Sequence, residues 1–297
     1  MASEYVMANQ SRSRSLDTTI RPAFKNILFA TDLSSAAEKG LWYAVEIARR
    51  YGAILHVIHV VGPPVYPYAP AAAWPKLAEE DKTFELEAKA KLEEQLQPVP
   101  HELIFQEGEV SPTLSDLIRA KQADLLVLGT HGRSGIEKAL MGSVAEKIFH
   151  QAACPVLTVG PKVTARSRYA AELNRILYAT DFSPESLAAA PYALSLAQEH
   201  RAQLILLNCL EDGAEAVHAM LQTLGRLVPF GADLRCEPIC IVERGPHGEN
   251  ILDVSEGHGA DLIVLGIACG PVKAHFHRSA LYKIATQATC PVLTVRA

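Results

Sequence analysis

The sequence lacks a long hydrophobic run. No stretch approaches the roughly 20 apolar residues that a membrane-spanning helix needs. It also lacks an excess of positive charge, because the 297 residues carry a formal net charge of -5; nucleic acid and anionic membrane surfaces are therefore not expected partners. The first 23 residues are polar and rich in Ser and Arg, unlike a signal peptide, and we expect a mobile tail there.

Cysteine pairs at disulfide or metal spacing are also missing. The chain has six Cys and no C-x-x-C pair, and Cys236 with Cys240 has no further Cys or His partner at metal-ligand spacing. His56 and His59 are more simply explained as strand histidines with local partners than as ligands. We expect no metal site, reduced and mostly buried cysteines, and a cytoplasmic location.

Three signatures of nucleotide-binding or hydrolytic enzymes are absent. No G-x-x-x-x-G-K-[ST] occurs, which excludes a P-loop NTPase. No G-x-G-x-x-G follows the first expected strand, which argues against a dinucleotide-dependent dehydrogenase. No G-x-S-x-G nucleophile elbow is present either, so the sequence predicts no catalytic residue.

The chain does contain an internal repeat. Three blocks occur twice in the same order, and such repetition indicates two homologous domains. The pairs are NILFATDLS at Asn26–Ser34 with RILYATDFS at Arg175–Ser183, ADLLVLG at Ala123–Gly129 with ADLIVLG at Ala260–Gly266, and CPVLTV at Cys154–Val159 and Cys290–Val295. We place the domains at 24–161 and 173–297, with a linker at 162–172 and the tail at 1–23.

Each repeat alternates short apolar runs with helical patterns. The runs are too short for helices and too continuously apolar for one-sided strands, so they fit a parallel sheet covered on both faces. In the first domain we expect strands at about 26–31, 53–61, 102–106, 124–129 and 155–159, and helices at about 35–51, 76–97, 112–121 and 142–152. The predicted fold is α/β, with two Rossmann-like or flavodoxin-like five-stranded parallel sheet domains in tandem, each in the order 3-2-1-4-5.

The predicted strand order brings two signals to one crevice. Open α/β sheets bind ligands beyond the carboxyl ends of their strands, where the winding reverses, here between the first and fourth strands. Thr31 and Asp32 follow the first strand, and Gly129 ends the fourth. We therefore expect these three residues to meet at one edge of the sheet.

A glycine-rich stretch follows the fourth strand of the first domain. Gly129 and Gly132 leave the backbone accessible to a ligand. Gly142 and Ser143 open the last helix, whose first amides and positive dipole end favour phosphate. Two plainer explanations stay open, since such glycines can simply turn the chain and the Gly-Ser pair can simply cap the helix.

Nearby side chains suit the other parts of a mononucleotide. His131 and Arg133 add charge from the loop, while Asp32 suits a ribose hydroxyl or an adenine amine. Val57, near the end of the second strand, offers an apolar wall for a base. Ribose, base and phosphate thus have separate places.

Four segments together resemble a known family. NILFATDLS, LHVIHV, ADLLVLGTHGRSG and MGSVAEKIFHQAACPVLTV are similar to the universal stress protein family in its tandem two-domain form, and the resemblance covers both halves from about Phe24 onward. ATP-binding members carry G-x2-G-x9-G-[ST], which this sequence matches at its Gly129, Gly132, Gly142 and Ser143. The nucleotide-binding residues that the resemblance implies are Thr31, Asp32, Val57, Leu128, Gly129, His131, Gly132, Arg133, Gly142, Ser143 and Val144.

The resemblance also implies a role for each part of this set. Asp32 holds the ribose or base, Val57 lines the adenine pocket, and the segments 129–132 and 142–144 bind the phosphates. ATP, ADP and AMP are equally compatible with these residues, with or without Mg²⁺.

The second domain departs from the family's pattern. Asp181 and Gly266 are retained, but Cys269 stands where the second glycine belongs, and Arg278 with Ser279 replaces the Gly-Ser pair. A Cβ and a long side chain at those positions crowd the backbone cradle. We therefore expect one nucleotide per chain, bound in the first domain.

The leading functional expectation is a cytoplasmic stress-response protein that acts as a nucleotide-dependent sensor or regulator. A slow ATP hydrolase and an interaction module with a vestigial nucleotide site are the alternatives. The family resemblance further implies that the last strands of the two domains pair within the chain, which leaves a homo-oligomer compatible but not required. The insert at 62–75 is expected either to close over the adenine or to pack on a partner or the other domain.

Overall fold

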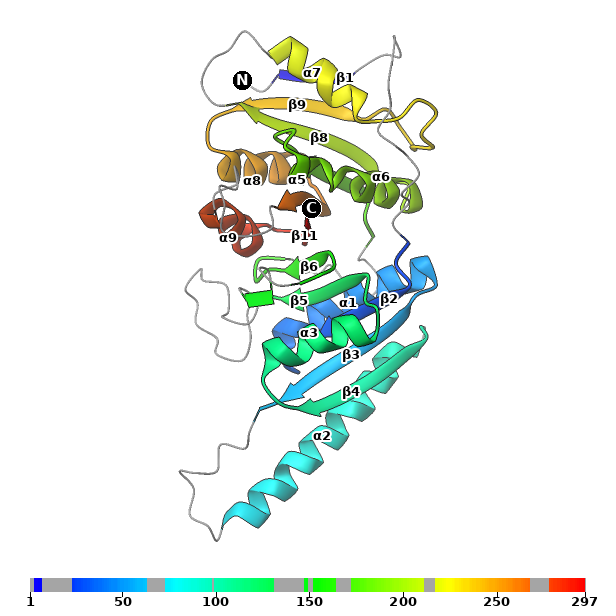
Figure 1. The fold of residues 1–297 in the computed structure, drawn as a ribbon, viewed down its shortest axis with the longest axis vertical. Helices are drawn as coiled ribbons and strands as arrows, with labels where there is room; N and C mark the ends of the chain where they lie inside the picture. The colour runs from blue at the N-terminus through cyan, green and yellow to red at the C-terminus, as the bar shows by residue number, and fades with distance from the viewer. Residues whose placement is uncertain are drawn as a thin grey trace.

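One long β-sheet runs through both repeats (Figure 1). The computed structural model describes residues 3–6, 23–62, 73–97, 99–130, 147–148, 152–163, 172–210, 217–267 and 278–296. Within these residues the sheet has 11 strands in the order β1-β9-β8-β7-β10-β11-β6-β5-β2-β3-β4. All neighbouring strands in it are parallel except the pairs β1 with β9 and β6 with β11.

The first half of the chain forms the end of the sheet with the order β6-β5-β2-β3-β4. Renumbered along the chain and read from β4, this is the order 3-2-1-4-5, so the predicted topology is confirmed. Its elements are β2 Asn26–Ala30, α1 Ser35–Tyr51, β3 Ile54–Val61, α2 Trp74–Leu96, β4 His101–Glu107, α3 Val110–Ala120, β5 Leu125–Gly129 and β6 Val156–Val159. The helix expected at 142–152 lies mostly outside the described residues.

The second half repeats this order as β9-β8-β7-β10-β11. Its elements are β7 Arg175–Ala179, α5 Pro184–Leu187, α6 Ala190–Glu199, β8 Gln203–Leu210, α7 Val217–Arg226, β9 Ile239–Arg244, α8 His247–Gly257, β10 Leu262–Ile267, α9 Arg278–Gln287 and β11 Val292–Arg296. The fold class is therefore the predicted tandem α/β arrangement. The exact domain boundaries stay predictions, since much of the linker lies outside the described residues.

Local sequence explains where α1 and α2 begin and end. The Ser34 hydroxyl accepts a hydrogen bond from the backbone N–H of Ala37 at 3.2 Å and caps α1. Gly52 ends that helix in the left-handed region, at φ 64°, and its N–H reaches the carbonyl of Ala48. α2 begins at Trp74, slightly before the expected start, with Pro75 in its first turn, where a missing N–H costs nothing.

A proline divides the first helical segment of the second half. α1 is one helix of 17 residues, but the corresponding segment splits into α5 and α6 around Ala188 and Ala189. Pro191 cannot donate the hydrogen bond that a continuous helix would need, and its ring clashes with the carbonyl four residues earlier. The two halves therefore differ in the helical segment that follows β2 in one and β7 in the other.

Four residues within the stretch expected to be a mobile tail form a strand, and residues 7–22 lie outside the described part of the chain. Ser3–Val6 forms β1 and pairs antiparallel with β9, in the register Tyr5 to Cys240. The strand satisfies backbone groups along an edge of β9 that would otherwise lack a partner. Four residues in a polar stretch are too short to show a strand pattern, so the sequence did not reveal it.

The two halves join through their last strands. β6 and β11 pair antiparallel, with Val292 opposite Thr158 and Thr294 opposite Val156. Each threonine hydroxyl donates across the junction, Thr158 to the Val292 carbonyl and Thr294 to the Val156 carbonyl, both at 3.2 Å. The junction thus extends the sheet without interruption.

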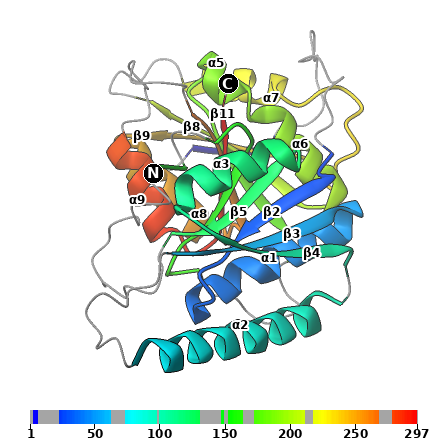
Figure 2. The same ribbon diagram turned by 60° about the horizontal axis from the view of Figure 1, so that its bottom comes forward.

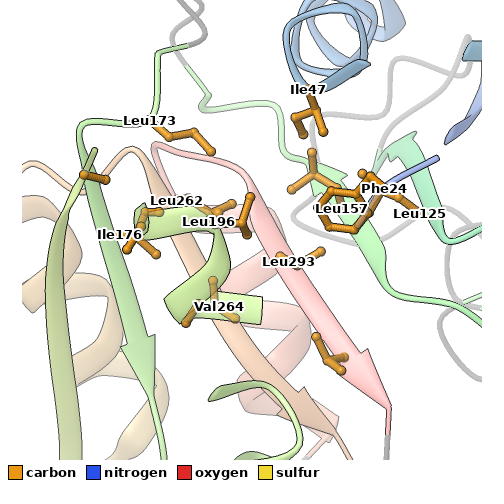
Figure 3. Close-up of a cluster of buried hydrophobic side chains, with 14 of the residues drawn as sticks. Phe24, Ile47, Leu125, Leu157, Leu173, Ile176, Leu196, Leu262, Val264 and Leu293 are labelled. Atoms are coloured by element: carbon orange, nitrogen blue, oxygen red, sulfur yellow. The ribbon is translucent and has the colours of Figure 1, made fainter. Parts of the chain in front are cut away.

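Helices from both halves cover the same face of this sheet. α1, α2, α6 and α7 share one continuous hydrophobic core, while α3, α8 and α9 pack on the opposite face. Figure 3 shows the centre of the shared core, where Phe24, Leu125 and Leu157 of the first half face leucines of the second. Those partners are Leu173, Leu196, Leu262 and Leu293.

The structure also bears on the hydrophobic runs and the cysteines. No helix in the described part of the chain is long and apolar enough to cross a membrane. Five of the six cysteines fall in the described ranges and are free thiols; Cys236 is exposed and the other four are buried.

Candidate functional site

The structure brings together the residues that end β2 and β5. These neighbouring strands are parallel, with Ala30 opposite Leu128. Thr31 and Asp32 follow directly after β2, and Gly129 is the last residue of β5. The three residues thus lie at one edge of the sheet, at the reversal of the strand order, where open α/β sheets hold ligands.

Two side-chain hydrogen bonds shape the loop after β2. Thr31 Oγ1 accepts from the N–H of Leu33 and Asp32 Oδ1 accepts from the N–H of Ser34, both at 3.0 Å. They hold Leu33 at φ 62°, a left-handed conformation that costs an ordinary residue about 1–2 kcal/mol. Asp32 therefore has a structural task in addition to the predicted ligand contact.

His59 supports the same loop and was not among the predicted site residues. Its Nδ1 lies 2.9 Å from the carbonyl oxygen of Thr31, and its ring packs edge-on against Phe105, with centroids 5.6 Å apart. The strand register could have revealed this contact, because Ala30 pairs with Ile58 and the next residues are Thr31 and His59. The prediction that His59 has a local partner is confirmed.

Val57 and Leu128 lie in the core and not on the surface of the crevice. Val57 is fully buried on the face covered by α1 and α2. Leu128 is 5% exposed and packs on the opposite face, with Leu28 and Ile58. Both side chains therefore support the site from within the protein, and the contact of Val57 with a base stays a prediction.

The remaining predicted site residues lie outside the described part of the chain. They are His131, Gly132, Arg133, Gly142, Ser143 and Val144. Their second-half counterparts are also largely undescribed: Cys269 lies outside, and Arg278 and Ser279 are placed only as the first residues of α9. The predicted phosphate loop thus stays a prediction from the sequence.

The second half shows that one glycine of the motif has a packing reason. Gly266 corresponds to Gly129, and a Cβ added to it would lie 2.7 Å from the carbonyl carbon of Glu185 and closer still to the carbonyl oxygen. The absence of a side chain lets α5 pack directly on β10. Since Gly266 stands in the domain that lacks the rest of the motif, the equivalent Gly129 is not by itself a sign of a ligand.

The second-half counterpart of Asp32 is closely held by the protein. Asp181 Oδ1 accepts from the N–H of Ser183 at 3.0 Å and from its hydroxyl at 2.6 Å. Burial alone would raise the pKa of the Asp181 carboxyl, but the hydrogen bonds from Ser183 and Ser186 outweigh it and lower that pKa. Asp181 is thus ionised and stabilised without a ligand.

Titratable groups of the neighbouring strands contact one another. His56 Nδ1 lies 2.7 Å from Glu102 Oε2, and Lys121 Nζ is equally close to that oxygen. The hydrogen bond from Lys121 is the main reason that the pKa of Glu102 lies below its ordinary value. Within the described ranges no three His, Cys, Asp or Glu side chains gather as a metal would require.

Comparisons with known proteins agree with the repeat. The model of the universal stress protein family matches residues 23–160 and 172–226. A universal stress protein from Methanocaldococcus jannaschii is 32% identical over 139 residues, which are 46% of this chain and 82% of that protein. Universal stress protein A homolog 1 of Coxiella burnetii is 34% identical over 145 residues, which are 47% of this chain and 98% of that protein.

A solved structure extends the likeness to nearly the whole chain. The crystal structure of a universal stress protein from Archaeoglobus fulgidus superposes with a TM-score of 0.67 and covers 91% of this chain and 98% of its own, at 22% sequence identity. At that identity the superposition shows a shared fold. Because the family model matches more than half of the residues, this chain belongs to the universal stress protein family.

Proposed function

We propose that this protein binds one adenine nucleotide per chain, at the carboxyl ends of β2 and β5. The observation that carries the proposal is the juxtaposition of Thr31 and Asp32 with Gly129 at the reversal of the strand order. The segment after Gly129 has the G-x2-G-x9-G-[ST] spacing that the family's ATP-binding members carry. Asp32 takes the ribose or base, and the amides of 129–132 and 142–144 take the phosphates.

The second half is proposed to bind no nucleotide. Its motif is interrupted in sequence at Cys269, Arg278 and Ser279. Asp181 accepts from the N–H of Ser183, as Asp32 does from that of Ser34, and it also accepts from the Ser183 hydroxyl. We infer that this half serves as a structural partner that fixes the geometry of the first.

We infer a regulatory role and not a catalytic one. A bound nucleotide shifts a protein's behaviour when it binds one of two conformations or assemblies more tightly. Such a role suits a stress-response protein, for which we infer a cytoplasmic location. The alternative, slow ATP hydrolysis, predicts steady phosphate release that Gly142→Lys abolishes.

Calorimetric titration with ATP, with and without Mg²⁺, tests the proposal. Asp32→Ala and Asp181→Ala form a matched pair, because each removes the hydrogen bond from a backbone N–H to the Asp carboxylate in the turn between strand and helix. We expect one site per chain, an affinity at least tenfold weaker in Asp32→Ala, and no change in Asp181→Ala. Two equivalent sites, or equal effects of the two substitutions, would refute the assignment, and no binding by the parent would favour a vestigial site.

A further inference from the structure

A cavity lies beside the predicted nucleotide site, between α1 and α2. It has a volume of about 270 Å³ and lies on the face of the first half that these helices cover. Figure 2 shows the two helices side by side below the strands. Thr31 borders it, but none of the other described residues of the predicted nucleotide site does. Its apolar lining consists of Phe29, Leu33, Leu41, Phe84, Ala88 and Leu92.

The opening of this cavity carries a net negative charge. Glu38 is already engaged, since its Oε1 accepts from Gln95 Nε2 at 2.7 Å and lies 3.3 Å from Lys91 Nζ. Glu87 is exposed and has no hydrogen bond or ion pair with the other described residues. Two carboxylates and one ammonium group therefore border the opening, and one carboxylate has no cation.

The corresponding corner of the second half carries different side chains, which are bonded to one another. Tyr178 takes the place of Phe29, and its hydroxyl donates to the Ser186 carbonyl at 2.8 Å. The Ser186 hydroxyl lies 2.8 Å from Thr180 Oγ1, whereas the first half has Ala37 at the position of Ser186 and so offers Thr31 no such partner. Phe29, which lines the cavity, thus stands at a position where the two repeats differ.

We propose that this cavity binds a small cationic amine with an aromatic or branched apolar body. A cavity of about 150 Å³ lined by Leu, Ile and Phe holds benzene, so this one has room for a ring with a short aminoalkyl chain. The ring lies among the leucines, and the ammonium group reaches the unpaired carboxylate of Glu87. The rings of Phe29 and Phe84, the latter 48% exposed, add aromatic faces that attract a cation. This inference does not depend on nucleotide binding.

Three compounds with one apolar body separate the contributions: 2-phenylethylamine as cation, 2-phenylethanol as neutral analogue and 3-phenylpropionate as anion. In calorimetric titrations of the full chain at pH 7 we expect the amine to bind at least tenfold more tightly than the alcohol. Glu87→Gln is expected to weaken amine binding three- to tenfold and to leave the alcohol unchanged. Preference for the anion, or no binding of the amine at millimolar concentration, would overturn the proposal.

A second substitution checks that the ligand occupies this cavity. Ala88→Leu fills it from α2, while Ala90→Leu places the same change on an exposed position of the same helix. We expect Ala88→Leu to reduce amine binding more than tenfold and Ala90→Leu to leave it unchanged, with both variants retaining the parent's circular dichroism. Undiminished binding in a folded Ala88→Leu variant would place the ligand elsewhere and refute the inference.

Discussion

The close packing of α5 on β10 predicts that Gly266→Ala strongly destabilises the protein. The added Cβ overlaps backbone atoms of Glu185 and Ser186, which cannot rotate away as a side chain could. Overpacking of this type costs about 1–3 kcal/mol. If α5 shifts to relieve it, the bonds of Ser186 with Tyr178 and Thr180 are strained as well, at about 0.5–1.5 kcal/mol each. The expected total loss is about 2–6 kcal/mol.

Urea denaturation followed by circular dichroism measures this loss. Gly257→Ala is the matched control, because Gly257 ends α8 in open space, with no atom within 4 Å of an added Cβ. We expect the control to be neutral or to gain up to about 1 kcal/mol from helix propensity. If Gly266→Ala lies within 1 kcal/mol of the parent, the glycine has no packing role, and the structural explanation offered for Gly129 falls with it.

Two further predictions concern the contact between the halves. Burial, and then the charge of Arg50, lowers the pKa of His200 from 6.5 to about 4. As the pH falls, the His200 side chain takes up a proton in the unfolded chain before it does so in the folded protein. The free energy of unfolding is therefore highest above pH 6.5 and decreases below it. Between pH 7 and pH 5 the parent should lose about 2 kcal/mol more of this free energy than His200→Phe, and equal losses in urea titrations would contradict the reasoning. At the strand junction, Thr158→Val and Thr294→Val should each lower the free energy of unfolding by about 1 kcal/mol in the same assay, because each removes one equivalent buried hydrogen bond. Clearly unequal losses would show that the junction is not symmetric.

The strand order and the meeting of Thr31, Asp32 and Gly129 could be predicted because they follow from repetition and alternation. Parallel strands place their carboxyl ends together, and right-handed crossovers leave few orders to choose from. The repeat supported the predicted strand order further, since one order had to fit the sequences of both halves. Local signals of this kind suffice to position a backbone edge.

Features that depend on distant contacts could not be predicted in this way. β1 is a strand because β9 offers it an edge, and its four residues carry no pattern of their own. The stretch around Val57 is apolar on both faces, so its periodicity does not say which side chains face α1. The cavity between α1 and α2 is lined by Phe29, where the other repeat has Tyr178, whose hydroxyl donates to the Ser186 carbonyl. These differences in residue type are visible in the sequence, but their effect on the shape of the protein depends on how the side chains pack.

The pairing of β6 with β11 inside one chain changes what evolution can do with the pair. In an assembly of identical subunits, every substitution appears on both sides at once, and the assembly separates on dilution. Here the partner is covalently attached, so it stays in place at any concentration. Each half is also encoded separately, so one half can carry Phe29 while the other carries Tyr178 at the corresponding position.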